Sequence, residues 1–165
     1  MKRKLLRSVS LASVLAVATM MLGSRAVLVA QTDQGHTIEG TWRLVVTPYV
    51  CGTDVTLSAF AALITYAQGG TLSGIGNSPH FLPGQRTPEF GVWSHTDGRQ
   101  FQSIREAFIL FPSPPPGLVR GTQRIEENTI VRGDELRSEA LSQLANESGI
   151  VVMSICARTT GTRMQ

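Results

Sequence analysis

The stretch FAALITYAQGGTLSGIGNSPHFLPGQRTPEFGVWSHTDGRQFQSIREAFILF, residues 60–111, decides the fold of this chain. Its apolar runs have the length of β-strands, and glycine-containing turns such as Gly69-Gly70 and Asp97-Gly98 separate them where a chain reversal is needed. We interpret the stretch as four consecutive antiparallel strands, at residues 60–66, 71–75, 90–95 and 101–111.

The segments on either side continue the same pattern. Trp42, Leu44 and Val46 alternate with other residues from Gly40 to Pro48, which is the period-2 signature of a strand with one buried face. Further strands are expected at residues 118–131, 135–144 and 150–157. Eight short strands without a helical pattern predict an all-β protein, a single eight-stranded antiparallel up-and-down barrel of calycin-like type, in which the first strand lies beside the last.

The first residues have the form of a secretory signal peptide. A basic segment at residues 1–7 precedes a short apolar run at 8–23, and Ser24 and Ala26 fit a small-x-small cleavage site. We therefore expect a signal peptide at 1–26 (with cleavage after residue 30 as the alternative), a flexible leader at 27–39 and the barrel at 40–163. The apolar run is shorter than a bilayer span needs, so we expect a secreted or periplasmic protein without a stable membrane span after processing.

Removal of the signal peptide changes the charge balance. The whole chain has 15 Lys and Arg against 12 Asp and Glu, a formal charge of +3. Five of the basic residues precede residue 27, which leaves ten against twelve, or −2, and no lysine. The mature part thus offers no basic face for nucleic acid and no lysine for Schiff-base catalysis.

Two cysteines, Cys51 and Cys156, remain in the predicted mature part. In an exported chain two cysteines most simply form one disulfide, with two buried free thiols as the alternative. The bond joins the end of the first strand to the last strand, which favours a closed barrel.

Gly40-Thr-Trp42, at the start of the first strand, resembles the Gly-x-Trp motif of lipocalins. The resemblance implies that an arginine near the chain end, Arg158 or Arg163, packs over Trp42. Because Trp42 and Trp93 each follow a glycine at the start of a strand, we expect both to be structural residues at the barrel floor. A disulfide that tethers the C-terminal part to the barrel is also lipocalin-like. The wider pattern is similar to exported bacterial proteins of calycin type, on the segments Gly40-Thr-Trp42, Gly69-Gly-Thr71, Gly91-Val-Trp93 and Gly161-Thr-Arg163.

A small barrel of this kind either is filled by side chains or holds one small ligand. The longest loop, 77–89, is the natural lid of such a lumen. We expect the 101–111 strand to turn Glu106, Phe108 and Leu110 inward. The candidate ligand-binding residues are Phe60, Ile64, Tyr66, Phe81, Trp93, Arg105, Glu106, Phe108 and Leu110.

Charged and metal-ligating residues add few constraints. Alternation predicts that either Arg105 or Glu106 faces inward, where a charge needs a partner. It either pairs with Glu139 or Arg124 as a structural bridge or orients the polar end of a ligand. The three histidines are far apart, so no metal site and no cofactor are predicted. No Gly-x-Ser-x-Gly nucleophile motif occurs, and no pattern fixes an oligomeric state.

Three functions remain open for the barrel. The first is binding of a small hydrophobic ligand in the lumen. The second is an isomerase or cyclase resembling allene oxide cyclase, in which the pocket acts mainly by positioning its substrate. The third is an envelope interaction protein with a solid core. A cavity distinguishes the first two from the third, and a polar pair that faces the cavity distinguishes the second from the first.

Overall fold

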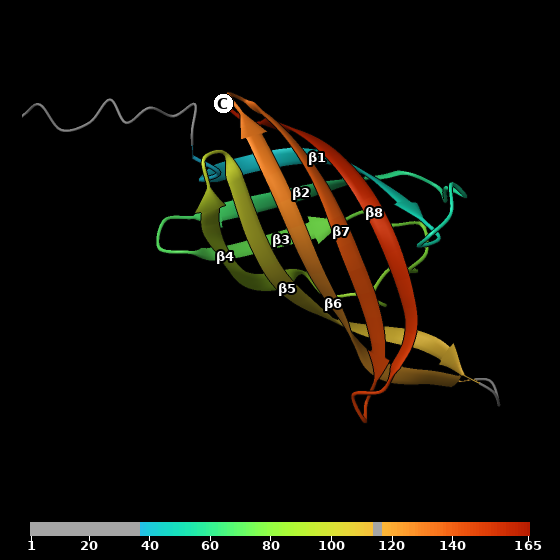
Figure 1. The fold of residues 1–165 in the computed structure, drawn as a ribbon. Helices are drawn as coiled ribbons and strands as arrows, with labels where there is room; N and C mark the ends of the chain where they lie inside the picture. Colours follow the sequence, from blue (N-terminus) through green and yellow to red (C-terminus); the bar gives the residue numbers. More distant parts are fainter. Residues whose placement is uncertain (1–36, 114–116) are drawn as a thin grey trace, which may run out of the picture. The chain divides into compact units, whose positions relative to one another are not determined.

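The computed structural model describes residues 37–113 and 117–165, and of residues 111–119 only the backbone. The predicted signal peptide, its cleavage site and most of the leader lie outside these ranges. The strands are β1 (Gly40–Tyr49), β2 (Phe60–Ala67), β3 (Thr71–Gly76), β4 (Glu89–Asp97), β5 (Gln100–Ser113), β6 (Gly117–Arg132), β7 (Glu135–Asn146) and β8 (Val151–Arg163). They form one closed barrel (Figure 1).

Every strand pairs antiparallel with the next along the chain, and β1 pairs with β8 to complete the circle. The predicted eight-stranded up-and-down barrel is therefore confirmed. The last strand is longer than predicted, because residues 160–163 continue the ladder opposite residues 42–45 of β1. The strands predicted at residues 71–75 and 90–95 correspond closely to the observed β3 and β4.

Trp42 closes one end of the barrel. It is fully buried, and its indole Nε1 donates a hydrogen bond to the carbonyl of Ile38 at 2.8 Å. The guanidinium of Arg163, opposite Trp42 in the ladder, lies 4.3 Å from the ring centroid. Arg163 also donates to the carbonyl of Thr37 at 2.7 Å and pairs with Asp134 at 3.1 Å. These bonds satisfy the polar groups at this end while the indole fills its centre.

The buried core is concentrated at the same end. Around Trp42 pack inward-facing side chains from most of the strands, with Trp93 and Val46 at the margin of the cluster. They are Ile38, Leu44, Ala62, Ile64, Tyr66, Leu72, Phe101, Val131 and Leu136. The opposite end of the barrel is not filled by this cluster.

The disulfide Cys51–Cys156 is present, with the two Cα atoms 5.0 Å apart. Tyr49 of β1 pairs with Cys156 of β8, so the bond lies just beyond the end of the β1–β8 ladder. It fastens the loop that leaves β1 to the last strand, as predicted. Such bonds are typical of proteins that leave the reducing cytosol.

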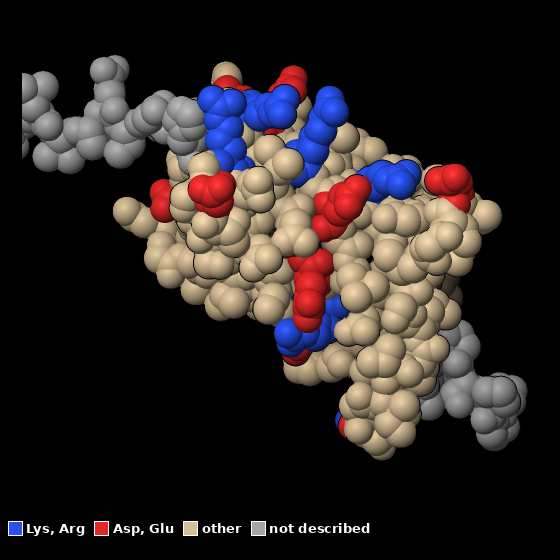
Figure 2. Space-filling model, in the orientation of Figure 1, with Lys and Arg blue, Asp and Glu red and all other residues tan. Residues whose placement is uncertain are grey.

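The second end of the barrel carries the long connections. The 50–59 loop, the 77–88 loop, the β5–β6 hairpin and the β7–β8 turn lie there, and β5–β8 extend beyond the shorter strands (Figure 1). In the view of Figure 2 the surface around this end shows few charged side chains, whereas charges of both signs gather toward the other end. Exposed apolar residues of the β7–β8 region include Ile150, Val151, Val152 and Met153.

Candidate functional site

A cavity of about 350 Å³ occupies the barrel between the Trp42 cluster and the end that carries the long loops. Small-molecule sites typically begin at about 300 Å³. Most of its wall is apolar and comes from every part of the sheet. The apolar lining residues are Leu44, Val46, Pro48, Leu57, Phe60, Ala62, Ile64, Phe81, Leu110, Ile125, Ala140, Leu144, Met153, Ile155 and Ala157.

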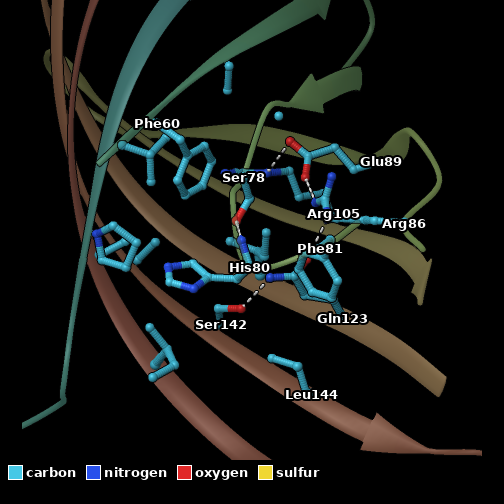
Figure 3. A pocket seen from close by; sticks show the side chains of 18 of the residues that line it. Phe60, Ser78, His80, Phe81, Arg86, Glu89, Arg105, Gln123, Ser142 and Leu144 are labelled. Atoms are coloured by element: carbon cyan, nitrogen blue, oxygen red, sulfur yellow. Dashed lines mark hydrogen bonds and ion pairs between the residues drawn. The ribbon is translucent and has the colours of Figure 1, made fainter. Parts of the chain in front are cut away.

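The 77–88 loop covers part of the mouth. Its two ends are fixed by backbone hydrogen bonds, from Asn77 to the carbonyl of Ala61 at 2.8 Å and from Thr87 to the carbonyl of Phe108 at 3.0 Å. Between these bonds the loop presents His80 and Phe81 to the cavity (Figure 3). The loop therefore forms one wall of the site, with the exposed His80 at its edge.

Arg86, Glu89, Arg105 and Gln123 meet at one side of the cavity (Figure 3). We call these four residues and Glu127, which pairs with Arg105, the polar cluster. Arg105 is its centre, with 6% of its side chain exposed. Its Nε lies 3.0 Å from Glu89 Oε1, although that contact is not aligned as a hydrogen bond, and its second ion pair is with Glu127. Ser138 donates to the other oxygen of Glu127.

The outer part of the polar cluster continues toward the cavity as a chain of hydrogen bonds. Arg86 pairs with the second oxygen of Glu89, and its Nε donates to Gln123 Oε1 at 2.6 Å. The amide nitrogen of Gln123 then donates to Ser142 Oγ at 2.8 Å. Arg86, Glu89, Arg105, Gln123 and Ser142 all line the cavity.

Two glycines make room for the polar cluster. A Cβ atom on Gly74 of β3 would lie 2.9 Å from Glu89 Oε1 and 2.8 Å from the side chain of Ile64. A Cβ atom on Gly91 of β4 would lie 2.7 Å from the Cβ of Arg105, its partner in the β4–β5 ladder. The absence of side chains at these positions leaves room for the Glu89 carboxylate beside β3 and for the close approach of β4 to Arg105 of β5.

The electrostatics of the polar cluster are set by burial and by ion pairing. Burial lowers the pKa of Arg105, but the carboxylates of Glu127 and Glu89 outweigh that effect and the pKa is raised overall. Arg105 is therefore a fixed cation. Burial, followed by the charge of Glu127, raises the pKa of the nearby Tyr66, which stays neutral.

The structure brings together five of the nine predicted ligand-binding residues. Phe60, Ile64, Phe81, Arg105 and Leu110 line the cavity.

Tyr66 and Trp93 are not in the lining; they belong to the closed end, where their rings meet edge to face at 6.3 Å between centroids. The Nε1 of Trp93 donates to the carbonyl of Ala67 at 3.0 Å. Both contribute to the packed part of the barrel.

The predicted inward orientation of Glu106 and Phe108 was wrong. Phe108 is 73% exposed, and Glu106 faces outward, where it forms an exposed ion pair with Arg124 at 3.1 Å. The inward residues of β5 are Phe101, Ser103, Arg105, Ala107 and Ile109. The cost of burying Arg105 is offset by two carboxylates on other strands, neither of them the suggested Glu139.

Sequence reasoning missed most of the polar cluster. Glu127 had a usable signal, because period-2 alternation places it on the same face as Thr129 and Val131 of a strand. Arg86 and Glu89 had none: they lie near prolines at the end of a long loop, and only the folded barrel brings them to Arg105. Gln123 and Ser142 lie in long strands with polar residues at many positions, so nothing in the sequence singles them out.

Comparisons with protein-family models, with curated proteins and with solved structures found no match to the chain. Among the residues that the structure describes, no three or more His, Cys, Asp or Glu side chains gather as a metal site would require. Within the same ranges no helix is both long and apolar enough to cross a bilayer.

Proposed function

We propose that this chain is an exported barrel that binds a small, mainly apolar molecule in its lumen. The observation that carries the proposal is the cavity of about 350 Å³, walled mostly by apolar side chains and open toward the loop-bearing end. Burial of apolar surface contributes roughly 25 cal/mol per Å², so such a wall favours an apolar ligand over water. The disulfide Cys51–Cys156 supports the proposed secreted or periplasmic location.

The proposed likeness to lipocalins has support at the other end of the barrel. Trp42 of the Gly-x-Trp segment lies under the guanidinium of Arg163, and both sit at the closed end. This arrangement confines the ligand to the half of the barrel with the long loops. The cavity also weighs against the alternative of an interaction protein with a solid core.

The isomerase or cyclase alternative has one observation in its favour, since a polar cluster faces the cavity. Its carboxylates, however, are occupied. Glu89 meets Arg86 with one oxygen and Arg105 with the other, and Glu127 is held by Arg105 and Ser138. A general base needs a carboxylate that reaches the substrate. The polar cluster thus favours orienting a bound molecule over transferring its protons.

The proposal is tested with N-phenyl-1-naphthylamine, an apolar probe whose fluorescence rises when it leaves water. We expect saturable binding to the folded protein at one site. Ala140→Trp, which places an indole inside the cavity, abolishes that binding while the protein stays folded. Leu141→Trp is the matched control, because the neighbouring Leu141 faces outward and is 37% exposed. Equal binding by the two variants, or no binding by the unmodified protein, contradicts the proposal.

A further inference from the structure

The polar cluster carries no net charge. Arg86 and Arg105 contribute two positive charges, and Glu89 and Glu127 contribute two negative ones. All four side chains are at most 10% exposed, so solvent screens them little. A site that binds a carboxylate or phosphate normally presents an uncompensated cation. Here every guanidinium already has its carboxylate, so an additional anion would be buried without a counter-ion, at a high desolvation cost.

The hydrogen bonds of the polar cluster also have a fixed direction. An arginine side chain only donates, so the amide oxygen of Gln123 faces Arg86 and its nitrogen faces Ser142. The hydroxyl oxygen of Ser142 therefore accepts a bond, and its proton remains to be donated. None of the described residues accepts that proton. Ser142 is 8% exposed and lines the cavity, so the donor is aimed at whatever fills it.

We infer that the ligand carries an uncharged acceptor oxygen, such as a ketone, aldehyde or ester carbonyl, which binds at Ser142 and Gln123 while its apolar part fills the rest of the lumen. The second N–H of the Gln123 amide is the other donor at this point. This inference rests on the proposed function, because it names the class of molecule that the same cavity takes. It excludes free fatty acids in their ionised form as the preferred ligands.

Competition against N-phenyl-1-naphthylamine at pH 8 tests the inference, with 2-decanone and decanoate as competitors of equal chain length. The expected result is displacement by 2-decanone at a concentration at least tenfold lower than by decanoate. Decanoate that binds as tightly as the ketone overturns the inference and leaves the proposed function standing. Failure of the fluorescent probe itself to bind overturns both.

Charge compensation is tested by Glu89→Gln, which gives the polar cluster one excess positive charge. We expect this variant to bind decanoate at least fivefold more tightly than the unmodified protein, with little change for 2-decanone. Glu106→Gln is the matched control, because it removes the same charge from the outer face of the barrel. If the affinity for decanoate rises equally in the two variants, or in neither, the charges of the polar cluster are not what excludes the anion.

Ser142→Ala tests the donor without changing any charge, and it also decides the matter if Glu89→Gln does not fold. One lost hydrogen bond of about 1 kcal/mol corresponds to roughly fivefold weaker binding of 2-decanone. Binding of N-phenyl-1-naphthylamine stays unchanged, which a merely structural effect would not allow. Ser154→Ala, at an exposed position of β8, serves as the control. Unaltered binding of 2-decanone by Ser142→Ala overturns the assignment of the donor.

Discussion

Replacement of Arg105 by methionine removes the centre of the polar cluster at nearly constant volume. It leaves Glu127, whose side chain is 2% exposed, with Ser138 as its remaining hydrogen-bond partner, whereas Glu89 keeps Arg86. Loss of one partner of a buried ion pair typically costs about 3–5 kcal/mol, because the other charge stays buried without compensation. We expect Arg105→Met to lower the free energy of unfolding by that amount.

The double variant Arg105→Met, Glu127→Met distinguishes charge from packing. It removes one positive and one negative charge, so that Arg86 and Glu89 remain as a matched pair. Replacement of both partners of a buried pair by apolar residues is often neutral or stabilising, so the second substitution should recover at least about 2 kcal/mol.

Urea unfolding measured by circular dichroism gives the free energies for the single variants, the double variant and an external control, Arg124→Met. Arg124 forms ion pairs on the outer face with a side chain that is 43% exposed, so its loss should cost at most about 1 kcal/mol. Two results would refute a buried ion pair at Arg105. One is that Arg105→Met lowers the free energy of unfolding no more than Arg124→Met does. The other is that the loss in the double variant equals the sum of the losses in Arg105→Met and Glu127→Met.

Four further variants test the barrel itself. Phe108→Ala should change the free energy of unfolding by less than about 0.5 kcal/mol, whereas Ile109→Ala should lower it by about 2–5 kcal/mol, because only Ile109 is buried. A larger loss for Phe108→Ala than for Ile109→Ala in urea unfolding would contradict the orientation of β5. Burial raises the pKa of Tyr66 above its unfolded value of about 10, so its contribution to stability is intact below that pH and falls above it by up to about 1.4 kcal/mol per pH unit. Tyr66→Phe should therefore reduce the loss of unfolding free energy between pH 9 and pH 11. An equal loss in the variant and the unmodified protein would count against this effect. Replacement of Cys51 and Cys156 by serine opens a loop of 105 residues and should lower the free energy of unfolding by up to about 4–5 kcal/mol relative to the oxidised protein. An unchanged midpoint of urea unfolding would show that the disulfide contributes nothing to stability.

Much of the fold was predictable because its determinants are local. The turns at Gly69-Gly70 and Gly133 have backbone dihedrals with positive φ, which glycine adopts without strain, and each lies between the strands that were expected. Alternation in β1 correctly placed Trp42 and Leu44 inside the barrel. The end of β8 was missed, because the pairing of Thr160 and its neighbours with β1 depends on closure of the barrel and not on their own sequence.

The candidate site was predictable only in part, because its polar half depends on distant residues. The apolar residues Phe60 and Ile64 were predicted to line the lumen and do so from the inward face of β2, although residues 60–66 carry apolar side chains on both faces. The face of β5 does not follow from its own sequence, since both faces carry large apolar residues. The inward face of β5 is selected because Arg105 pairs with Glu89 and Glu127 there. These carboxylates become its neighbours only when β4, β5 and β6 pair.

Occupation of the lumen is tested most directly by nuclear Overhauser effects between a bound molecule and the methyl groups of the protein. With 2-decanone added to methyl-labelled protein, we expect contacts from the ligand chain to Leu44, Ile64 and Leu144, which line the cavity. Val45 of β1 and Ile75 of β3 lie on the outside of the barrel, where they are 53% and 54% exposed, and should show no contact with the ligand. Contacts confined to the outward-facing methyl groups, or none at all at saturating ligand, would contradict a barrel that binds its ligand inside.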